Sequence, residues 1–244
     1  EAQLLVPHLK GRRVWMLNST AEGGGVAEML PNLIAILREL GVNIRWLVMG
    51  SSERRFFILT KRIHNLIHGF GEPFFSREDI DIYKKESIET ADDLSQIISN
   101  EDILIVHDPQ PLGAGAELKR RIGMPAIWRC HIGLDMQTTE TNAAWEFLKD
   151  DAGIYDHAVF SAPEYIPPFL AGRSSIIHPA IDPLSHKNRD FSTHKLVGIL
   201  SNAGLINTPH PVLTPPWRHK ALRLQPGGSF VPANEGIPLG LLYR

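Results

Sequence analysis

Polar side chains able to bind a ligand directly follow several short apolar segments of this chain. They comprise a carboxylate, two imidazoles, a guanidinium and an amide, at His107, Asp108, Gln110, Arg129 and His131. An ionised carboxylate accepts two hydroxyl protons at once, and a guanidinium donates to sugar or phosphate oxygens through a rigid fork. An imidazole can donate to a hydroxyl or to charge that develops at a reacting centre. Together these groups favour a site for a polar ligand.

A glycine run is a further candidate binding element. Gly23, Gly24 and Gly25 stand between the apolar residues 14–17 and an amphipathic segment that stops at Gly41. A strand, a glycine turn and a helix in this order place backbone N–H groups at a helix N-terminus, which attracts phosphate or polar oxygen. The run is neither G-x-G-x-x-G nor followed by G-K-[ST], so it indicates neither dinucleotide binding nor a P-loop. A tight turn without a ligand is the alternative.

Alternating strands and helices must position these groups. The expected strands cover residues 14–17, 44–49, 103–106, 126–128, 158–160 and 175–177, and the expected helices about residues 26–40, 59–70, 76–98 and 115–121. Ser76 and Asp79 resemble a capping box at the start of the third helix. This alternation predicts an α/β fold, a Rossmann-like parallel sheet with helices on both faces. In such a sheet ligands bind at the carboxyl ends of the strands, so the polar residues are expected at one edge.

Composition narrows the class of protein. The 244 residues carry a formal net charge of −2, which gives no reason to expect nucleic acid or an anionic membrane as partner. No apolar run reaches the roughly 18–20 residues that span a bilayer, and no signal-peptide pattern opens the chain. Cys130 is the only cysteine, so no intrachain disulfide is possible and a reducing, cytoplasmic location is expected.

The last part of the chain differs from the rest. We predict a Rossmann-like domain over residues 1–185 and an irregular, Pro/Gly-rich tail over residues 186–244. From Phe191 onward the chain holds five basic residues and one acid, Glu235, and its apolar run at 196–200 leads into no convincing helix. The hypothesis for this tail is a truncation or a reading-frame change, and an exposed half-interface would favour a homo-oligomer.

Five motifs in order carry a family resemblance. They are Gly23-Gly24-Gly25-Val26-Ala27-Glu28, Phe56-Phe57 with Thr60-Lys61 and His64-Asn65, His107-Asp108-Pro109-Gln110-Pro111, Trp128-Arg129-Cys130-His131, and His178-Pro179-Ala180-Ile181-Asp182-Pro183-Leu184. Over about residues 4–190 the chain resembles the N-terminal half of the trehalose glycosyltransferring synthases, which are retaining glycosyltransferases of the GT-B fold.

The resemblance implies a reaction and roles for residues. Glucose would pass from a nucleotide-sugar donor, UDP- or ADP-glucose, to a glucose acceptor held by the N-terminal domain, with retained configuration. His131 and Asp108 would be catalytic, and the substrate would contact Gly23, Gly24, Gly25, Lys61, His64, Asn65, His107, Gln110 and Arg129. No cofactor or protein nucleophile is expected, since catalysis would rest on positioning and on stabilising the leaving diphosphate. The tail lacks the paired glutamates of the donor half, so the donor is expected to bind only if a C-terminal domain is supplied.

Alternatives remain at this stage. A trehalose phosphorylase would use inorganic phosphate in place of the nucleotide, and a sugar-binding or subunit domain would pair with a separate chain. His64 and His68 stand at a metal-like spacing, but Asn65 stands where a zincin needs its glutamate and no third ligand follows, so no metal site is expected. Lys61, His64 and Asn65 lie within one helical turn, where a solvated helix face is equally expected.

Overall fold

The computed structural model describes residues 2–22, 24–51, 53–180 and 190–202, together with two short strands at 222–224 and 230–232. The chain divides into two compact units, Glu1–Pro179 and Ala180–Arg244. The domain boundary predicted at residues 185 and 186 lies outside the described residues, and it stays a prediction.

Six parallel strands form the sheet of the first unit. They are β1 (Val14–Asn18), β2 (Ile44–Val48), β3 (Ile103–His107), β4 (Ala126–Cys130), β5 (His157–Phe160) and β6 (Ser174–Ile176). Their order across the sheet is β2-β1-β3-β4-β5-β6. The predicted fold class is therefore confirmed, and every predicted strand is present.

The helices of this unit follow the strands in alternation. They are α1 (Ala2–Leu5), α2 (Gly25–Glu39), α3 (Arg54–Ile67), α4 (Arg77–Ser95), α5 (Leu112–Ile122) and α6 (Thr139–Ala152), with 3₁₀ turns at Val6–Leu9, Pro163–Tyr165 and Pro168–Leu170. The capping box of Ser76 and Asp79 at the start of α4 is confirmed. Pro31 lies inside α2 without ending it. Helix α6 was not predicted, because its buried face is made largely of small side chains.

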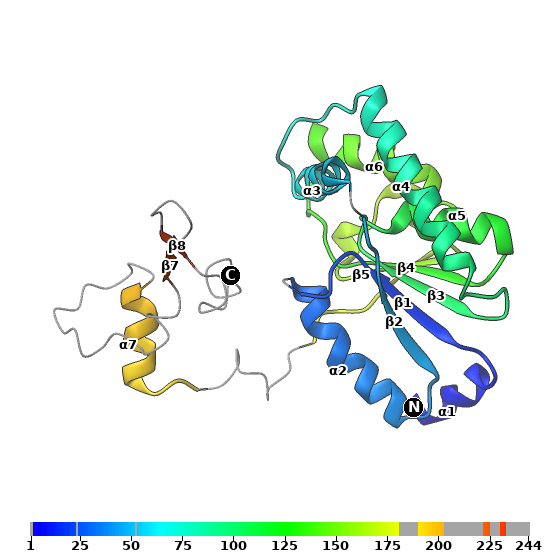
Figure 1. Ribbon diagram of the computed structural model, residues 1–244, viewed down its shortest axis with the longest axis horizontal. Coiled ribbons are helices and arrows are strands. Elements are labelled where there is room, and N and C mark those ends of the chain that lie inside the picture. The colour runs from blue at the N-terminus through cyan, green and yellow to red at the C-terminus, as the bar shows by residue number, and fades with distance from the viewer. Residues whose placement is uncertain are drawn as a thin grey trace. The chain divides into compact units, whose positions relative to one another are not determined.

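Helices lie on both faces of the sheet (Figure 1). Helix α2 packs Leu30 and Ile34 on Val14 and Met16 of β1, in a small apolar core. On the opposite face, α3, α4, α5 and α6 form the larger core, whose fully buried members include Trp128. The alternation of side chains along each strand sends successive residues of β1 into different cores.

The second unit contains less described structure. Helix α7 (Thr193–Asn202) lies in the segment predicted to be an irregular tail, and it includes the apolar run at 196–200. Strands β7 (Leu222–Leu224) and β8 (Phe230–Pro232) pair antiparallel.

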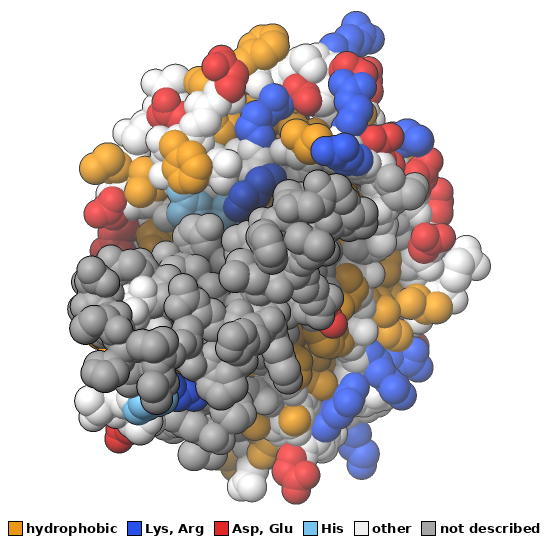
Figure 2. Space-filling view, turned by 60° about the vertical axis from the view of Figure 1, so that its left-hand side comes forward, with side chains coloured by type: hydrophobic (Ala, Val, Ile, Leu, Met, Phe, Trp, Pro, Cys, Tyr) orange, Lys and Arg blue, Asp and Glu red, His pale blue; other side chains and the backbone are white. Residues whose placement is uncertain are grey.

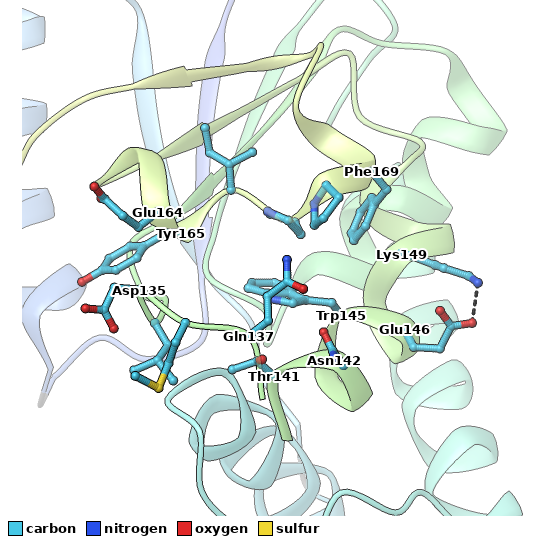
Figure 3. A pocket seen from close by; sticks show the side chains of 15 residues that line it. Asp135, Gln137, Thr141, Asn142, Trp145, Glu146, Lys149, Glu164, Tyr165 and Phe169 are labelled. Atoms are coloured by element: carbon cyan, nitrogen blue, oxygen red, sulfur yellow. Dashed lines mark hydrogen bonds and ion pairs between the residues drawn. The ribbon is translucent and has the colours of Figure 1, made fainter. Parts of the chain in front are cut away.

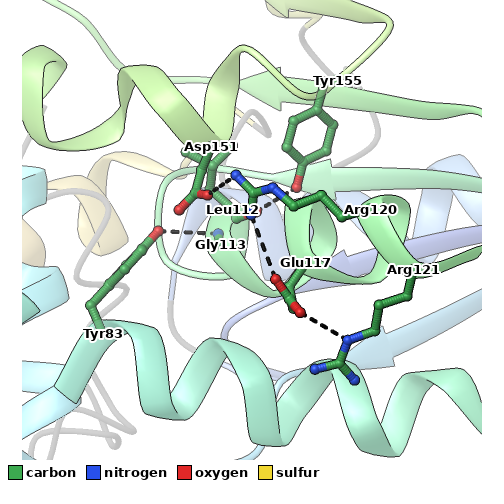
Figure 4. A network of polar contacts seen from close by, with 8 residues as sticks. All are labelled: Tyr83, Leu112, Gly113, Glu117, Arg120, Arg121, Asp151 and Tyr155. Carbon is green, nitrogen blue, oxygen red and sulfur yellow. Dashed lines mark hydrogen bonds and ion pairs between the residues drawn. The ribbon is translucent and has the colours of Figure 1, made fainter. Parts of the chain in front are cut away.

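Two buried tyrosines anchor the beginning of α5 (Figure 4). The Tyr83 hydroxyl donates to the carbonyl of Pro109 at 3.3 Å and accepts the N–H of Gly113 at 3.1 Å. The Tyr155 hydroxyl donates to the carbonyl of Leu112 at 2.6 Å. Because these bonds hold the residues that follow β3, they fix the loop on which Asp108 stands.

Gly115 leaves no room for a side chain beneath α5. A Cβ at this position would lie 2.3 Å from Tyr155 Oη and 2.6 Å from a methyl group of Val106. Alanine normally favours a helix by about 1 kcal/mol over glycine, but overpacking costs about 1–3 kcal/mol. We expect Gly115→Ala to lower the free energy of unfolding in urea. The control Gly172→Ala, whose Cβ would meet nothing within 4 Å, should change it little, and a stable Gly115→Ala protein would contradict this packing.

On the surface drawn in Figure 2, acidic and basic side chains lie interspersed among apolar ones. Among the described residues, no helix is both long and apolar enough to cross a membrane.

Candidate functional site

The carboxyl ends of β1, β3 and β4 lie next to one another at one edge of the sheet. The three strands are parallel neighbours, and His107 of β3 is the register partner of Arg129 of β4. Asp108 and His131 are the residues that directly follow these two strands. Parallel pairing therefore gathers the predicted polar residues of β3 and β4 at a single edge, where α/β sheets bind ligands.

Asp108 is held at this edge by three hydrogen bonds. Its backbone N–H donates to the carbonyl of Arg129 at 2.9 Å, and its own carbonyl accepts the indole N–H of Trp128 at 3.0 Å. Its side-chain Oδ1 accepts the backbone N–H of His131 at 2.8 Å. Its φ of 62° is the left-handed conformation, which among the described residues no other non-glycine adopts. Aspartate tolerates this conformation, and the three bonds maintain it.

The two imidazoles form a pair. His107 Nδ1 and His131 Nε2 lie 3.0 Å apart, and the rings are nearly parallel with centroids separated by 5.3 Å. One of these two nitrogens must carry a proton and donate the hydrogen bond, and the other must accept the bond. The pair therefore fixes the orientation of both rings, and it leaves Nδ1 of His131 and Nε2 of His107 for other partners.

Three buried polar atoms at this edge have no hydrogen-bond partner within the part of the chain that the structure describes. They are His107 Nε2, Gln110 Oε1 and Arg129 Nη1. The other terminal nitrogen of Arg129, Nη2, donates to the carbonyl of Ile177 at 2.8 Å. Buried polar groups are nearly always paired, since an unpaired one costs about 1–3 kcal/mol. Unpaired groups gathered at a sheet edge therefore point to a ligand that supplies the missing partners.

Burial changes the protonation of this edge. It raises the pKa of Asp108 to about 6, although the His131 N–H and the Arg129 guanidinium act in the opposite direction. Burial also lowers the pKa of His107 to about 4, with the nearby Arg129 charge adding to the effect. The pKa of His131 falls to about 3 through burial and the charges of His107 and Arg129. Near pH 7 the edge therefore holds two neutral imidazoles and an ionised carboxylate.

These shifts predict how stability depends on pH. As pH falls from about 6.5 to 4, the unfolded chain binds protons on His107 and His131 that the folded chain does not, so stability decreases. Asp108 opposes this between its unfolded pKa of 3.8 and about 6, where the folded state binds the extra proton. Urea denaturation measures how much the free energy of unfolding decreases between pH 7 and pH 5. We expect this decrease to be smaller by about 1–2 kcal/mol in His131→Asn than in the parent chain.

His8→Asn, a replacement on the exposed turn Val6–Leu9, is the control for this measurement. An unchanged pH dependence in His131→Asn would show that this imidazole is not buried in its neutral form.

The glycine run leads into α2 as predicted. Gly24 is the residue that precedes the helix, with φ of 140°, and Gly25 is its first residue. No described side chain caps this end. Because α2 follows β1, this end lies at the carboxyl end of that strand, which is the neighbour of β3. Gly23 lies outside the described residues.

The predicted group on α3 is only partly brought together. Lys61 and Asn65 line a shallow hollow on the outer side of this helix, and His64 does not. The ring of His64 lies 4.6 Å from that of His68, whose Nδ1 is 2.8 Å from the His64 carbonyl. Burial lowers the pKa of His64 to about 4, with the Lys61 charge as the next cause. Within the described ranges, no three His, Cys, Asp or Glu side chains are placed to hold a metal ion.

Two features of the site were not predicted. Trp128 entered only as part of a motif, yet its indole N–H bonds the Asp108 backbone. A cavity of about 490 Å³, lined by residues of α6 and of the segments after β4 and β5, was not predicted either. Cys130 is buried and unpaired, and its thiol donates to the carbonyl of Ile132 at 3.4 Å. Burial raises the pKa of this thiol, so it is not an activated nucleophile.

The six-stranded parallel sheet with helices on both faces defines a Rossmann-like α/β domain. A profile of the family described as "Trehalose synthase, N-terminal domain" matches residues 16–167. The match covers more than half of the chain, so the chain belongs to this family.

Curated relatives agree with this placement. The trehalose synthase of Pyrococcus horikoshii is 35% identical over 217 residues, covering 86% of this chain and 50% of the relative. The trehalose synthase of Rubrobacter xylanophilus is 36% identical over 209 residues, covering 84% of this chain and 49% of the relative. The trehalose phosphorylase of Pleurotus sajor-caju is 29% identical over 141 residues, covering 54% of this chain and 18% of the relative. The chain therefore spans about half the length of the synthases it matches. The similarity also continues past the residues 4–190 noted from the motifs.

A solved structure shows the same fold. It is described as "Trehalose-6-phosphate from E. coli bound with UDP-2-fluoro glucose" and is 17% identical, with a TM-score of 0.57. The alignment covers 79% of this chain and 54% of that chain. The first unit is therefore the N-terminal half of a GT-B fold.

Proposed function

We propose that this chain forms the acceptor side of a retaining glucosyl transfer in which a nucleotide-activated glucose is joined to glucose, making trehalose. Family membership supports the reaction class. The observation that carries the acceptor site is the anchored Asp108, whose second oxygen, Oδ2, bonds no described residue while Oδ1 is held by His131. A fixed carboxylate with a free oxygen is suited to accept a sugar hydroxyl proton.

The neighbouring residues have complementary roles in this proposal. His131 is neutral near pH 7, so it can donate to a substrate hydroxyl or to charge that develops at the reacting carbon. His107 orients His131 through the shared proton, and Gln110 and Arg129 offer unpaired atoms to ligand oxygens. The start of α2 at Gly25 would face phosphate or sugar oxygens.

In this proposal the nucleotide-sugar donor binds to a different domain from the acceptor. We propose that UDP- or ADP-glucose binds through a C-terminal domain, and that the present chain binds sugar without turning it over by itself. Catalysis would then rest on positioning and on stabilising the leaving diphosphate, with no protein nucleophile.

Calorimetry on the purified chain tests this proposal. Glucose or trehalose should bind in the absence of nucleotide, whereas UDP-glucose should bind no more tightly than its glucose moiety. Tight UDP-glucose binding would place a donor site in this chain and contradict the division of roles. Absence of any sugar binding would contradict the acceptor site.

A phosphorolytic reaction is the second candidate, favoured by the matches to trehalose phosphorylases. It would release glucose-1-phosphate from trehalose with inorganic phosphate and without a nucleotide. Phosphate-dependent release of this product would select it over the transferase.

A further inference from the structure

A cavity of about 490 Å³ is lined by residues other than those proposed for the acceptor edge. Its walls are the loop after β4, the first turns of α6 and the segment after β5 that ends at Phe169 (Figure 3). None of Asp108, His131 or Arg129 lines it. The volume is within the range of about 300–1,000 Å³ typical of small-molecule sites.

Aromatic rings line this cavity, and the packing beneath them holds two of them in place. The ring of Trp145 stands edge-on to the buried Trp128, with centroids 6.3 Å apart. The ring of Tyr165 packs directly on Gly133, where an added Cβ would lie 2.2 Å from Tyr165 Cγ. Phe169 at the rim is 39% exposed. Aromatic faces carry partial negative charge and attract the polarised C–H groups of a ligand that lies flat on them.

The polar side chains of the cavity are available to a ligand. Asp135, Gln137, Asn142 and Glu164 line it, and their side chains make no hydrogen bond or ion pair with a described residue. The one cation of the lining, Lys149, is paired with Glu146. Two carboxylates therefore remain without a compensating cation, which disfavours a phosphorylated ligand by like-charge repulsion.

We propose that this cavity is a second carbohydrate site, which binds an unphosphorylated pyranose sugar of one or two rings. A pyranose offers an apolar C–H face to Trp145 and Tyr165, and its vicinal hydroxyls can donate to Asp135 and Glu164. The amides of Gln137 and Asn142 both donate and accept, so they suit hydroxyl groups of either role. The site uses residues that the proposed acceptor edge does not, so either site can fail without the other.

Ligand-observed and protein-observed NMR on the full 244-residue chain tests the proposal. Trehalose and glucose are titrated into the Asp108→Asn chain, in which the acceptor edge is disabled, and the Trp145 indole N–H is assigned by its loss in Trp145→Phe. We expect a saturable shift of this resonance. Combining Gln137→Ala and Asn142→Ala should weaken that binding at least tenfold, and Asp150→Ala on the same helix should not. Circular dichroism confirms that each variant is folded, which is expected for the changes at Gln137, Asn142 and Asp150 because these residues are exposed.

Three outcomes would overturn the second site. The first is no shift at Trp145 with either sugar. The second is equal binding of glucose 6-phosphate, because the uncompensated carboxylates should repel it. The third is binding that survives in the double variant but disappears in Asp108→Asn, since that result would place the sugar at the acceptor edge alone.

Discussion

Asp108→Asn is expected to weaken glucose binding about ten- to hundredfold, which corresponds to the loss of one hydrogen bond to a charged group. The asparagine keeps an oxygen that can accept the backbone N–H of His131, now 2.8 Å from Asp108 Oδ1. It replaces the free carboxylate oxygen by an NH₂ group, which cannot accept a sugar hydroxyl proton. Isothermal titration calorimetry with glucose and trehalose at pH 7 measures this change.

The same variant should be more stable than the parent at pH 7. Burial raises the pKa of Asp108 to about 6, so the ionised carboxylate destabilises the folded state at higher pH. Asparagine removes this charge and tolerates the φ of 62°. We expect a gain of roughly 1–3 kcal/mol in urea denaturation at pH 7. The gain should decrease through pH 6 and be absent below pH 3.8, where Asp108 is protonated in both states.

Cys130→Ser is the comparison for the binding measurement. The thiol is buried beside the site and bonds only the carbonyl of Ile132 among the described residues. It should therefore affect sugar binding much less than Asp108→Asn does. Equal or reversed effects would remove Asp108 from the acceptor site.

Trp128→Phe is expected to lower both stability and sugar binding. The fully buried indole packs edge-on to Phe160 at 5.6 Å, and its N–H bonds the Asp108 carbonyl at 3.0 Å. Phenylalanine leaves a void, and it leaves the Asp108 carbonyl without its donor. We expect the free energy of unfolding to fall by about 2–3 kcal/mol. Because this bond helps to hold the left-handed backbone of Asp108, the binding constant for glucose should also fall several-fold.

Trp15→Phe provides a matched control. Trp15 is also buried, and its indole N–H bonds Asp102 at 3.1 Å, next to the amino end of β3. It should lose comparable stability in urea denaturation, while the glucose binding of the folded protein should be unchanged. If both variants reduced binding equally, loss of stability rather than the position of Asp108 would explain the effect.

Periodicity in the sequence was sufficient to predict most of the fold. Each apolar run that was predicted as a strand is one, and Ser76 with Asp79 marked the start of α4 through a local capping pattern. Helix α6 was missed because its buried positions Ala144 and Ala152 produce little hydrophobic contrast. The apolar run inside α7 was also not predicted to be helical, because the prolines and glycines around it resemble turn signals.

Local sequence was also sufficient to place Asp108, His131 and Arg129 together at one edge of the sheet. A parallel sheet places the residue after each strand at the same edge, so order along the chain implies proximity in space. The partners of these residues were not predictable in the same way. The pairing of His107 with His131 and the bond from Trp128 to Asp108 each join residues at least 20 positions apart.

Contacts of that kind depend on strand register and on the packing of the rings, neither of which leaves a periodic signal in the amino-acid order. The cavity beside α6 is the clearest case, since Trp145 and Tyr165 both line it only because Trp145 packs on Trp128 of β4 and Tyr165 packs on Gly133 of the following loop. The amino-acid sequence therefore determined the kind of sheet and the edge at which the candidate site lies. Folding in three dimensions determined which buried groups stay unpaired there, because burial and pairing depend on neighbours that are distant along the chain.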